Sequence, residues 1–264
     1  MYLADLGAEV VRLEGPQRPD PIRSSPPFDE GASVWHSLLG RSKRSIAIDL
    51  NNPNAPEIIQ NLVQDYDIVL EQFRPGVMDR LGIGYEALRA ANPYVIYCAL
   101  TGYGQTGPLR DRAGHDINYL SLAGVANALG SKTNGPVPLS VQVADVGAGR
   151  LTLLVGLLAA VIHRSTTGQG QFVDVSMHAG SISWNSIQAM AALATGIDPG
   201  REESLLNGGT YYNFYKTSDG RYMSVGSLEP KFWRALCDAL DRDDLYELGM
   251  SSKPEDQSIV KDAL

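Results

Sequence analysis

The feature that most constrains the fold is an alternation between short β-rich runs and segments with helical spacing. Strand-like runs at Ser45–Leu50, Asp67–Leu70 and Tyr94–Leu100 are separated by helix-like segments at Pro56–Gln64 and Tyr85–Ala91. Strands separated by helices of this length become parallel neighbours, because the crossover helix carries the chain back to the same end of the sheet. The pattern predicts an α/β fold with a parallel, Rossmann-like sheet and helices on both faces.

The N-terminal segment has the pattern of the second half of one such βα unit. Residues 2–8 have helical composition around Gly7, a residue suited to the end of a helix, and residues 8–15 form a short strand-like run that stops at Gly15-Pro16. A helix that feeds a strand packs on a sheet that also has a strand before the helix. No such strand precedes Met1, so we expect the first strand of the sheet to be missing.

The rest of the chain divides into two regions. The pattern predicts helices at Ile117–Leu129, Gly149–His163 and Gly180–Ala194, with a strand at Phe172–Met177. After Gly196 the sequence becomes polar and Gly-rich, and a hairpin with its turn at Ser218-Asp219-Gly220 precedes a helix at Pro230–Leu240. We therefore place a large domain at residues 1–196 and the start of a smaller α+β domain at residues 197–264.

Composition excludes several classes of function. The 264 residues carry 22 Lys and Arg against 30 Asp and Glu, and a net charge of −8 argues against nucleic acid or an anionic membrane as partner. The longest apolar stretch, Leu151–Val161, is shorter than the roughly 20 residues of a membrane span and predicts a buried helix. Cys98 and Cys237 lack disulfide or metal-site spacing, and no secretory signal is visible, so we expect a cytoplasmic protein.

A literal GxGxxG occurs at Gly102–Gly107, directly after a predicted strand. A dinucleotide-binding fingerprint must open a helix, so that the pyrophosphate meets the helix N-terminus. Here Pro108 and the charged run Arg110–Arg112 follow, which is typical of a loop. We expect a turn or a close backbone approach at these glycines and no nicotinamide or flavin site.

Three polar residues stand at predicted helix starts, and each has a structural alternative. His115 and Asp145 precede the two strongly apolar helices, and Glu229 precedes Pro230. Each is typical of helix capping, because carboxylates and other polar groups satisfy the free N–H groups there. The three could also converge in one pocket as catalytic groups. Sequence spacing alone leaves both interpretations open.

Basic residues cluster at the ends of the predicted strands. Arg41, Lys43 and Arg44 precede one strand, while Arg74 and Arg80 follow another. In an acidic chain, such residues are candidates to hold phosphate groups. The alternative is that they are solvated loop charges.

Read together, the segments resemble the family III CoA-transferase and α-methylacyl-CoA racemase (CaiB/BaiF-like) family. The resemblance follows the family's order over nearly the whole chain. It rests on LADLGAEVVRLE, KRSIAIDL, FRPGVMDRLGIGYE, NPYVIYCALTGYGQTGP, AGHDINYL, DVGAGRLTLLVGLLAA, GQGQFVDVSM and DGRYMSVGSLEPKFW.

The resemblance implies an activity and three catalytic residues. Racemases of the family carry GHDINY, as this chain does, and use the His as one of two bases; the transferases usually have another residue there. By this resemblance His115 and Asp145 are the two bases, and Glu229 orients His115 and favours its protonated form. The implied enzyme is an isomerase of fatty acid metabolism that epimerises 2-methyl-branched acyl-CoA thioesters through an enolate. The alternative is a CoA-transferase in which Asp145 is the nucleophile, and a non-enzymatic acyl-CoA binder is a third possibility.

The resemblance also implies how the CoA moiety is held, with no other cofactor and no metal. One set of expected contacts is Ile48, Asp49, Leu50, Asn51, Phe73, Arg74 and Arg80; a second is the turn Gly114, Asp116, Ile117, Asn118 and Tyr119. The chain departs from the family at Gly15, where racemases often have an Arg, and Gln17-Arg18 is a candidate replacement.

Family members form interlocked homodimers, so we expect a dimer in which Glu229 faces His115 and Asp145 of the other subunit. They also begin with an additional strand before the helix at Tyr2 and continue past Leu264. The resemblance therefore implies a partial chain, and we expect it to be poorly stable or poorly dimeric as it stands.

Overall fold

The computed structural model describes all residues from Met1 to Leu264 and divides the chain into two compact units. The first unit comprises Met1–Tyr97 and Ala160–Phe172, and the second comprises Cys98–Ala159 and Val173–Leu264. The boundary expected near residues 196–197 lies inside the second unit, and it stays a prediction about domains.

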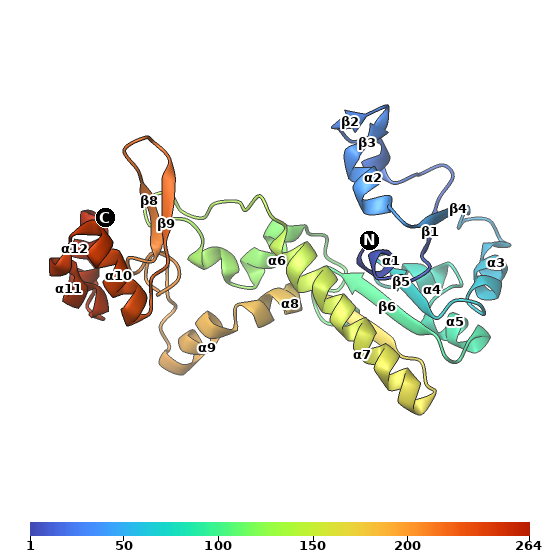
Figure 1. Ribbon diagram of the computed structural model, residues 1–264. Helices are drawn as coiled ribbons and strands as arrows, with labels where there is room; N and C mark the ends of the chain where they lie inside the picture. Colours follow the sequence, from blue (N-terminus) through green and yellow to red (C-terminus); the bar gives the residue numbers. More distant parts are fainter. The chain divides into compact units, whose positions relative to one another are not determined.

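The first unit is built from short helices and strands that follow the predicted alternation (Figure 1). Val11–Glu14 pairs in parallel with Arg44–Ala47, with Val11 opposite Arg44 and Glu14 opposite Ala47. In chain order the elements are α1 (Tyr2–Asp5), β1 (Val11–Glu14), the 3₁₀ turn η1 (Pro21–Ser24), β2 (Phe28–Asp29), β3 (Ala32–Ser33), α2 (Val34–Gly40), β4 (Arg44–Ala47), α3 (Ala55–Leu62), β5 (Ile68–Glu71), α4 (Val77–Arg80) and α5 (Tyr85–Ala91).

A second sheet has the strand order β5-β6-β7, where β6 is Ile96–Thr101 and β7 is Phe172–Ser176. The backbone N–H of Ile96 donates to the carbonyl of Asp67, and the rings of Tyr85, Tyr97 and Phe172 pack together. The predicted mixed α/β fold, with parallel strands and flanking helices, is confirmed.

The second unit continues with helices and ends in a hairpin and a helical cluster. Its elements are α6 (Asp116–Leu122), the 3₁₀ turn η2 (Val125–Ala128), the π-helix η3 (Val143–Leu151), α7 (Thr152–Thr167, which runs into the first unit), α8 (Met177–Trp184), α9 (Ser186–Thr195), β8 (Asn213–Lys216), β9 (Tyr222–Val225), α10 (Pro230–Leu240), η4 (Asp243–Leu245), α11 (Tyr246–Met250) and α12 (Pro254–Ala263).

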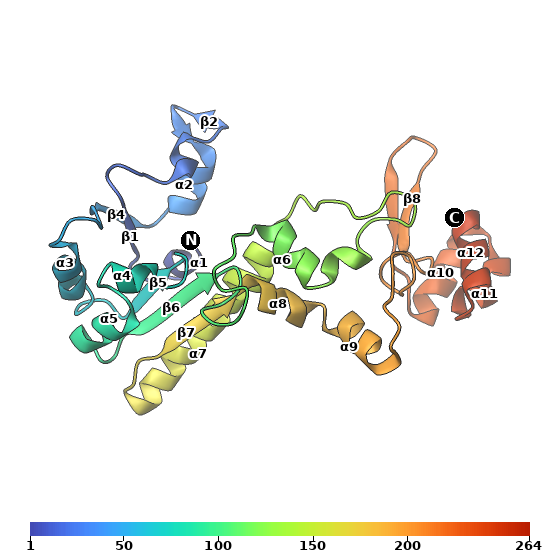
Figure 2. The ribbon, with the colours of Figure 1, turned by 180° about the vertical axis from the view of Figure 1, so that it is seen from behind.

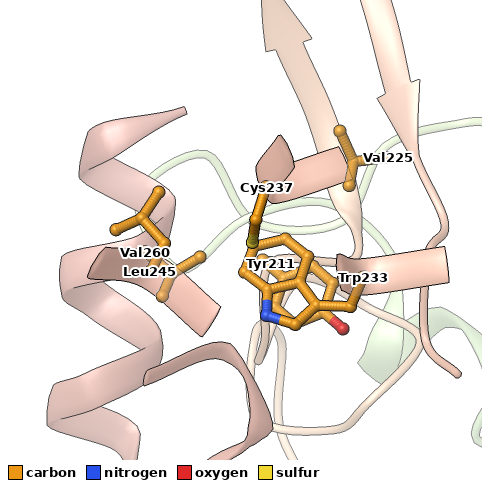
Figure 3. Close-up of a cluster of buried hydrophobic side chains, with 6 residues drawn as sticks. All are labelled: Tyr211, Val225, Trp233, Cys237, Leu245 and Val260. Carbon is orange, nitrogen blue, oxygen red and sulfur yellow. The ribbon is translucent and has the colours of Figure 1, made fainter. Parts of the chain in front are cut away.

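The C-terminal part has its own hydrophobic core (Figure 3). Tyr211 stacks on Trp233 with ring centroids 4.1 Å apart, and the indole N–H of Trp233 donates to the carbonyl of Tyr246. Val225, Cys237, Leu245 and Val260 complete the cluster. The predicted hairpin and the helix Pro230–Leu240 are both confirmed, since β8 pairs antiparallel with β9 and α10 has the predicted bounds.

Three helix predictions had the wrong bounds. The helix expected at Ile117–Leu129 ends at Leu122, because Gly124 adopts a left-handed conformation (φ 80°). The helix expected at Gly180–Ala194 is broken in two at Asn185. The helix expected from Gly149 begins six residues earlier as the π-helix η3, a rare form that the sequence pattern does not predict.

Together η3 and α7 form one helix of 25 residues from Val143 to Thr167, with a stretch of mean hydropathy 1.8. Its length and composition meet the requirement for a membrane span, which the stretch Leu151–Val161 alone does not. A single such helix is weak evidence, because core helices of soluble proteins pass the same test. Only 33% of the stretch is buried, so the expected burial holds for the face of Leu153 and Leu157 and not for the whole helix.

Candidate active site

His115 stands immediately before α6, at the N-cap position that the sequence predicts. The side-chain oxygen of Asn118 accepts from the backbone N–H of His115 at 3.0 Å, and the His115 carbonyl accepts from the N–H groups of Asn118 and Tyr119. These bonds fix the backbone of the turn and leave the imidazole side chain exposed. The turn therefore presents His115 to solvent at the start of a buried helix.

Asp145 is the third residue of the π-helix η3 and is half-buried. Its backbone N–H donates to Oδ1 of Asp116 at 2.9 Å, which satisfies one of the free donors at the start of η3. Its side-chain Oδ2 accepts from Nε2 of Gln142 at 2.8 Å. The starts of α6 and η3 are thus bonded to each other, and this bond brings His115 and Asp145 to one place.

The surroundings of Asp145 raise the pKa of its carboxyl group. Burial is the largest cause, because it disfavours the charged form, and the negative charge of Asp116 acts in the same direction. The hydrogen bond from Gln142 and the nearby His115 oppose this shift. A carboxyl group with a raised pKa, near a histidine, is suited to general acid–base chemistry.

The turn that carries His115 rests on the buried ring of Tyr119, whose side chain is 5% exposed. The Tyr119 hydroxyl donates to the Gly114 carbonyl at 2.6 Å. A Cβ atom on Gly102 or Gly114 would come within 2.6 or 2.7 Å of the Tyr119 side chain, so both positions must lack a side chain. The ring of Tyr103 completes this packing in an edge-to-face contact with Tyr119.

Helix α8 packs on both η3 and α6, and Figure 2 shows α8 next to α6. Glycines make this close approach possible. Trp184 covers Gly147, Met177 contacts Gly149, and a methyl group on Gly180 would overlap the carbonyl of Ala148. The glycines of the DVGAG segment therefore serve helix packing directly after Asp145.

The GxGxxG segment forms a loop, as the sequence predicts. The N–H of Gly104 donates to Oγ1 of Thr101, and the N–H of Gln105 donates to the carboxylate of Asp174. No helix begins until Asp116. The segment therefore lacks the strand–turn–helix geometry of a dinucleotide-binding fingerprint. The backbone of Gly102 approaches the side chain of Tyr119 closely, which is the close backbone approach that the glycines predict.

Glu229 is the N-cap residue of α10 and is exposed. Its carbonyl accepts from the N–H groups of Phe232 and Trp233. No hydrogen bond or ion pair joins Glu229 to His115 or Asp145 within the chain. The structure thus brings together two of the three predicted catalytic residues, and the catalytic role of Glu229 stays a prediction.

The residues expected around CoA fall in two places. In the first unit, Ile48–Asn51 follow β4 and Phe73-Arg74 follow β5, so both segments extend from the carboxyl ends of strands, where α/β folds bind ligands. Ile48 is buried, and Asp49 accepts two hydrogen bonds from Asn51. Leu50, between Asp49 and Asn51 in the chain, is half-buried.

The cations of the first unit differ in their engagement. Arg41 and Arg44 pair with Asp5 and Glu9, and the ammonium group of Lys43 donates to the carbonyl of Leu39. Arg74 and Arg80 are exposed and make no side-chain ion pair or hydrogen bond. Exposed, unengaged guanidinium groups are suited to bind phosphates, whereas Arg41, Lys43 and Arg44, at the start of β4, have a structural role.

In the second unit, the expected contacts occupy the start of α6. Ile117 and Asn118 are exposed, whereas Gly114 and Asp116 are half-buried. Tyr119 is buried beneath the turn, so its side chain supports the turn from inside. The sequence does not predict the contact of Gln142 with Asp145, because a lone Gln before a Gly-rich segment carries no recognisable signal.

Comparison with known proteins places the chain in a family. A model described as CoA-transferase family III matches residues 1–263. Human α-methylacyl-CoA racemase is 37% identical over 242 residues, which cover 91% of this chain and 59% of that protein. Succinyl-CoA–D-citramalate CoA-transferase of Chloroflexus aurantiacus is 33% identical over 244 residues, which cover 92% of this chain and 60% of that protein. The chain therefore spans about three fifths of the length of these relatives.

Solved structures agree with the sequence matches. A CAIB/BAIF family protein from Brucella suis superposes with a TM-score of 0.80 at 30% identity, covering 98% of this chain and 71% of that one. A hypothetical protein from Mycobacterium tuberculosis superposes with a TM-score of 0.81 at 30% identity, covering 99% of this chain and 71% of that one. By its sequence and its fold, the chain belongs to CoA-transferase family III.

Proposed function

We propose that the protein is an acyl-CoA racemase that inverts the α-carbon of 2-methyl-branched acyl-CoA thioesters. The observation that carries the proposal is the juxtaposition of His115 and Asp145 at the joined starts of α6 and η3, with the pKa of Asp145 raised. A histidine and a carboxyl group held together can exchange protons with a carbon acid between them. The 37% identity to an α-methylacyl-CoA racemase supports this choice within the family.

The proposed chemistry uses two bases in turn. A thioester acidifies its α-carbon, and one base removes the α-proton while the other, in its protonated form, delivers a proton to the opposite face. When Asp145 accepts the proton, protonated His115 donates one, and the reverse reaction exchanges these roles. Backbone N–H groups of the surrounding turns would stabilise the enolate oxygen. The proposed reaction needs no cofactor other than the CoA moiety of the substrate, because it includes no redox step and no hydrolysis.

CoA binding in this proposal relies on groups remote from the reacting carbon. Arg74 and Arg80 are the cations available to the phosphates, and the segment Ile48–Asn51 would border the nucleotide. Binding energy gained at the CoA end positions the α-carbon between the two bases.

We also propose that the active protein is a homodimer. The helix formed by η3 and α7 exposes apolar side chains at helical spacing, with Val155 69% and Ile162 66% exposed on α7. Leu158 of α7 and Leu151 at the end of η3 continue this stripe. On α9, Ile187 is 81% exposed and Leu193 79% exposed. Apolar stripes of this length are unfavourable in water, and a second copy of the chain would cover them.

The competing function within the family is CoA transfer between carboxylic acids. A CoA-transferase is 33% identical to this chain. Asp145 would then attack the acyl-CoA thioester and displace the CoA thiolate, which would attack the resulting anhydride, release the first carboxylate and leave CoA on Asp145 as a thioester. The distinguishing feature is His115, which a transferase of this kind does not need.

The test is proton NMR of a 2-methylacyl-CoA in D₂O, with and without succinate as acceptor. The racemase proposal predicts loss of the α-proton signal without acceptor, and a decrease of about 100-fold or more in His115→Ala and Asp145→Asn. His163→Ala, which changes a histidine on α7, is the matched control and keeps the wild-type rate. Exchange that survives His115→Ala, or CoA transfer to succinate without exchange, would overturn the proposal.

A further inference from the structure

Gln142 makes the only side-chain hydrogen bond that the structure gives to the carboxylate of Asp145. Its Nε2 lies 2.8 Å from Oδ2, and Gln142 is the exposed N-cap residue of η3, three positions before Asp145. The Gln142 carbonyl accepts from the N–H of Val146, so its backbone belongs to the first turn of the helix. The side chain is thus anchored beside the carboxylate that it contacts.

We propose that Gln142 is a positioning residue for Asp145, which holds Oδ2 through its amide N–H and leaves Oδ1 as the oxygen that exchanges a proton with the substrate. The inference rests on the proposed function of Asp145 and adds a residue to it. An ionised carboxylate has only acceptors, so the amide must present its NH₂ group to it. A proton on Oδ2 would compete with this hydrogen bond, whereas a proton on Oδ1 would not.

The Gln142 amide also opposes the groups that raise the pKa of Asp145. Burial and Asp116 raise the pKa of the carboxyl group, and Gln142 and His115 lower it. The titratable side chains on the segments packed against η3 are His115 before α6, Asp116 and Tyr119 of α6, and His178 of α8. Among the groups that act on Asp145, Gln142 supplies a donor that is neutral at every working pH. It supports the ionised form without the full charge of a Lys or Arg.

A purely structural role for Gln142 would have different consequences. Its side chain is exposed, so replacement removes little packing. A cap lost from η3 would lower stability and the rate at every pH alike. A residue that acts through the Asp145 carboxylate changes the pH at which that carboxylate ionises.

The experiment uses two substitutions with opposite expected signs. In Gln142→Leu the donor is lost, the pKa of Asp145 rises, and the acid limb of the pH–rate profile for α-proton exchange moves to higher pH, with kcat about tenfold lower. In Gln142→Lys a cation replaces the amide, and the acid limb moves to lower pH. Gln169→Leu changes an exposed loop glutamine without a side-chain hydrogen bond and keeps the wild-type profile.

A second readout separates this inference from the proposed function. ¹³C NMR titration of the Asp145 carboxyl carbon, assigned by its loss in Asp145→Asn, measures the same two shifts without substrate. If the wild type transfers CoA instead of exchanging the α-proton, the racemase proposal fails, yet the titration still tests Gln142. Identical Asp145 titrations in wild type, Gln142→Leu and Gln142→Lys would overturn the inference.

Discussion

The backbone N–H of Asp145 donates to Oδ1 of Asp116 across 2.9 Å, although the two residues are 29 positions apart in the chain. This bond joins the N-terminal ends of η3 and α6, which are also in packing contact. Because His115 directly precedes Asp116, the same bond sets the position of the histidine relative to the carboxylate.

Substitutions at Asp116 separate its charge from its acceptor oxygen. Asp116→Asn keeps an oxygen for the N–H of Asp145 but removes the negative charge that raises the pKa of Asp145. The pKa therefore falls, and the acid limb of the pH–rate profile for α-proton exchange moves to lower pH. Asp116→Ala also leaves the N–H without its acceptor, and we expect an additional loss of roughly tenfold in rate. Equal profiles and rates in the two variants would show that the bond is unimportant.

Gly180→Ala tests the packing that supports the π-helix. The new methyl group would overlap the carbonyl oxygen of Ala148, so α8 and η3 must separate. We expect the free energy of unfolding, obtained from urea unfolding curves, to fall by about 1–3 kcal/mol. The exchange rate is expected to fall as well. Gly226→Ala is the control, because its nearest neighbour is a ring carbon of Tyr212 at 3.4 Å. The packing argument fails if both substitutions have the same effect.

Arg74→Ala and Arg80→Ala test the proposed phosphate contacts. Each removes an exposed cation, so we expect KM for the acyl-CoA to rise about tenfold with kcat nearly unchanged. The increase is expected to shrink at high ionic strength, because salt screens exposed charges. Arg89→Ala is the matched control, since Arg89 pairs with Glu86 and lies over the ring of Tyr85. A fall in kcat at constant KM would place these residues in a different role.

Glu229 is tested by mixing subunits. If Glu229 serves the site of the partner chain, a heterodimer of His115→Ala and Glu229→Gln subunits contains one site with both native residues. Co-expression of the two inactive variants in equal amounts would then restore about a quarter of the wild-type exchange rate, since half of the dimers carry one active site of two. If Glu229 acts within its own chain, every site carries one substitution and no activity returns.

Several parts of the fold follow from local sequence pattern. The helix-like segment Tyr85–Ala91 predicts α5 with the bounds that the structure has, and the β-rich run at Ser45–Leu50 predicts a strand whose first half lies in β4. Both predictions succeed because side-chain period is a local property. Pro230 after Glu229 predicts the start of α10, since proline fits the first turn of a helix. A polar residue before an apolar helix likewise marks His115 as an N-cap. The same pattern predicts that Asp145 precedes its helix, but Asp145 lies inside the first turn and Gln142 is the N-cap.

Sequence alone determined the alternation of strands and helices, the loop character of Gly102–Gly107 and the short list of candidate residues. Only the tertiary structure decided that the helix of Asp145 begins as a π-helix, a rare form that no local sequence pattern marks and that here packs against α8. It also decided that the segment of His115 is bonded to Asp145 through Asp116, whereas no hydrogen bond or ion pair joins Glu229 to either residue within the chain. Such arrangements depend on contacts like the hydrogen bond of Asp145 to Asp116, which joins two segments that are far apart in the sequence.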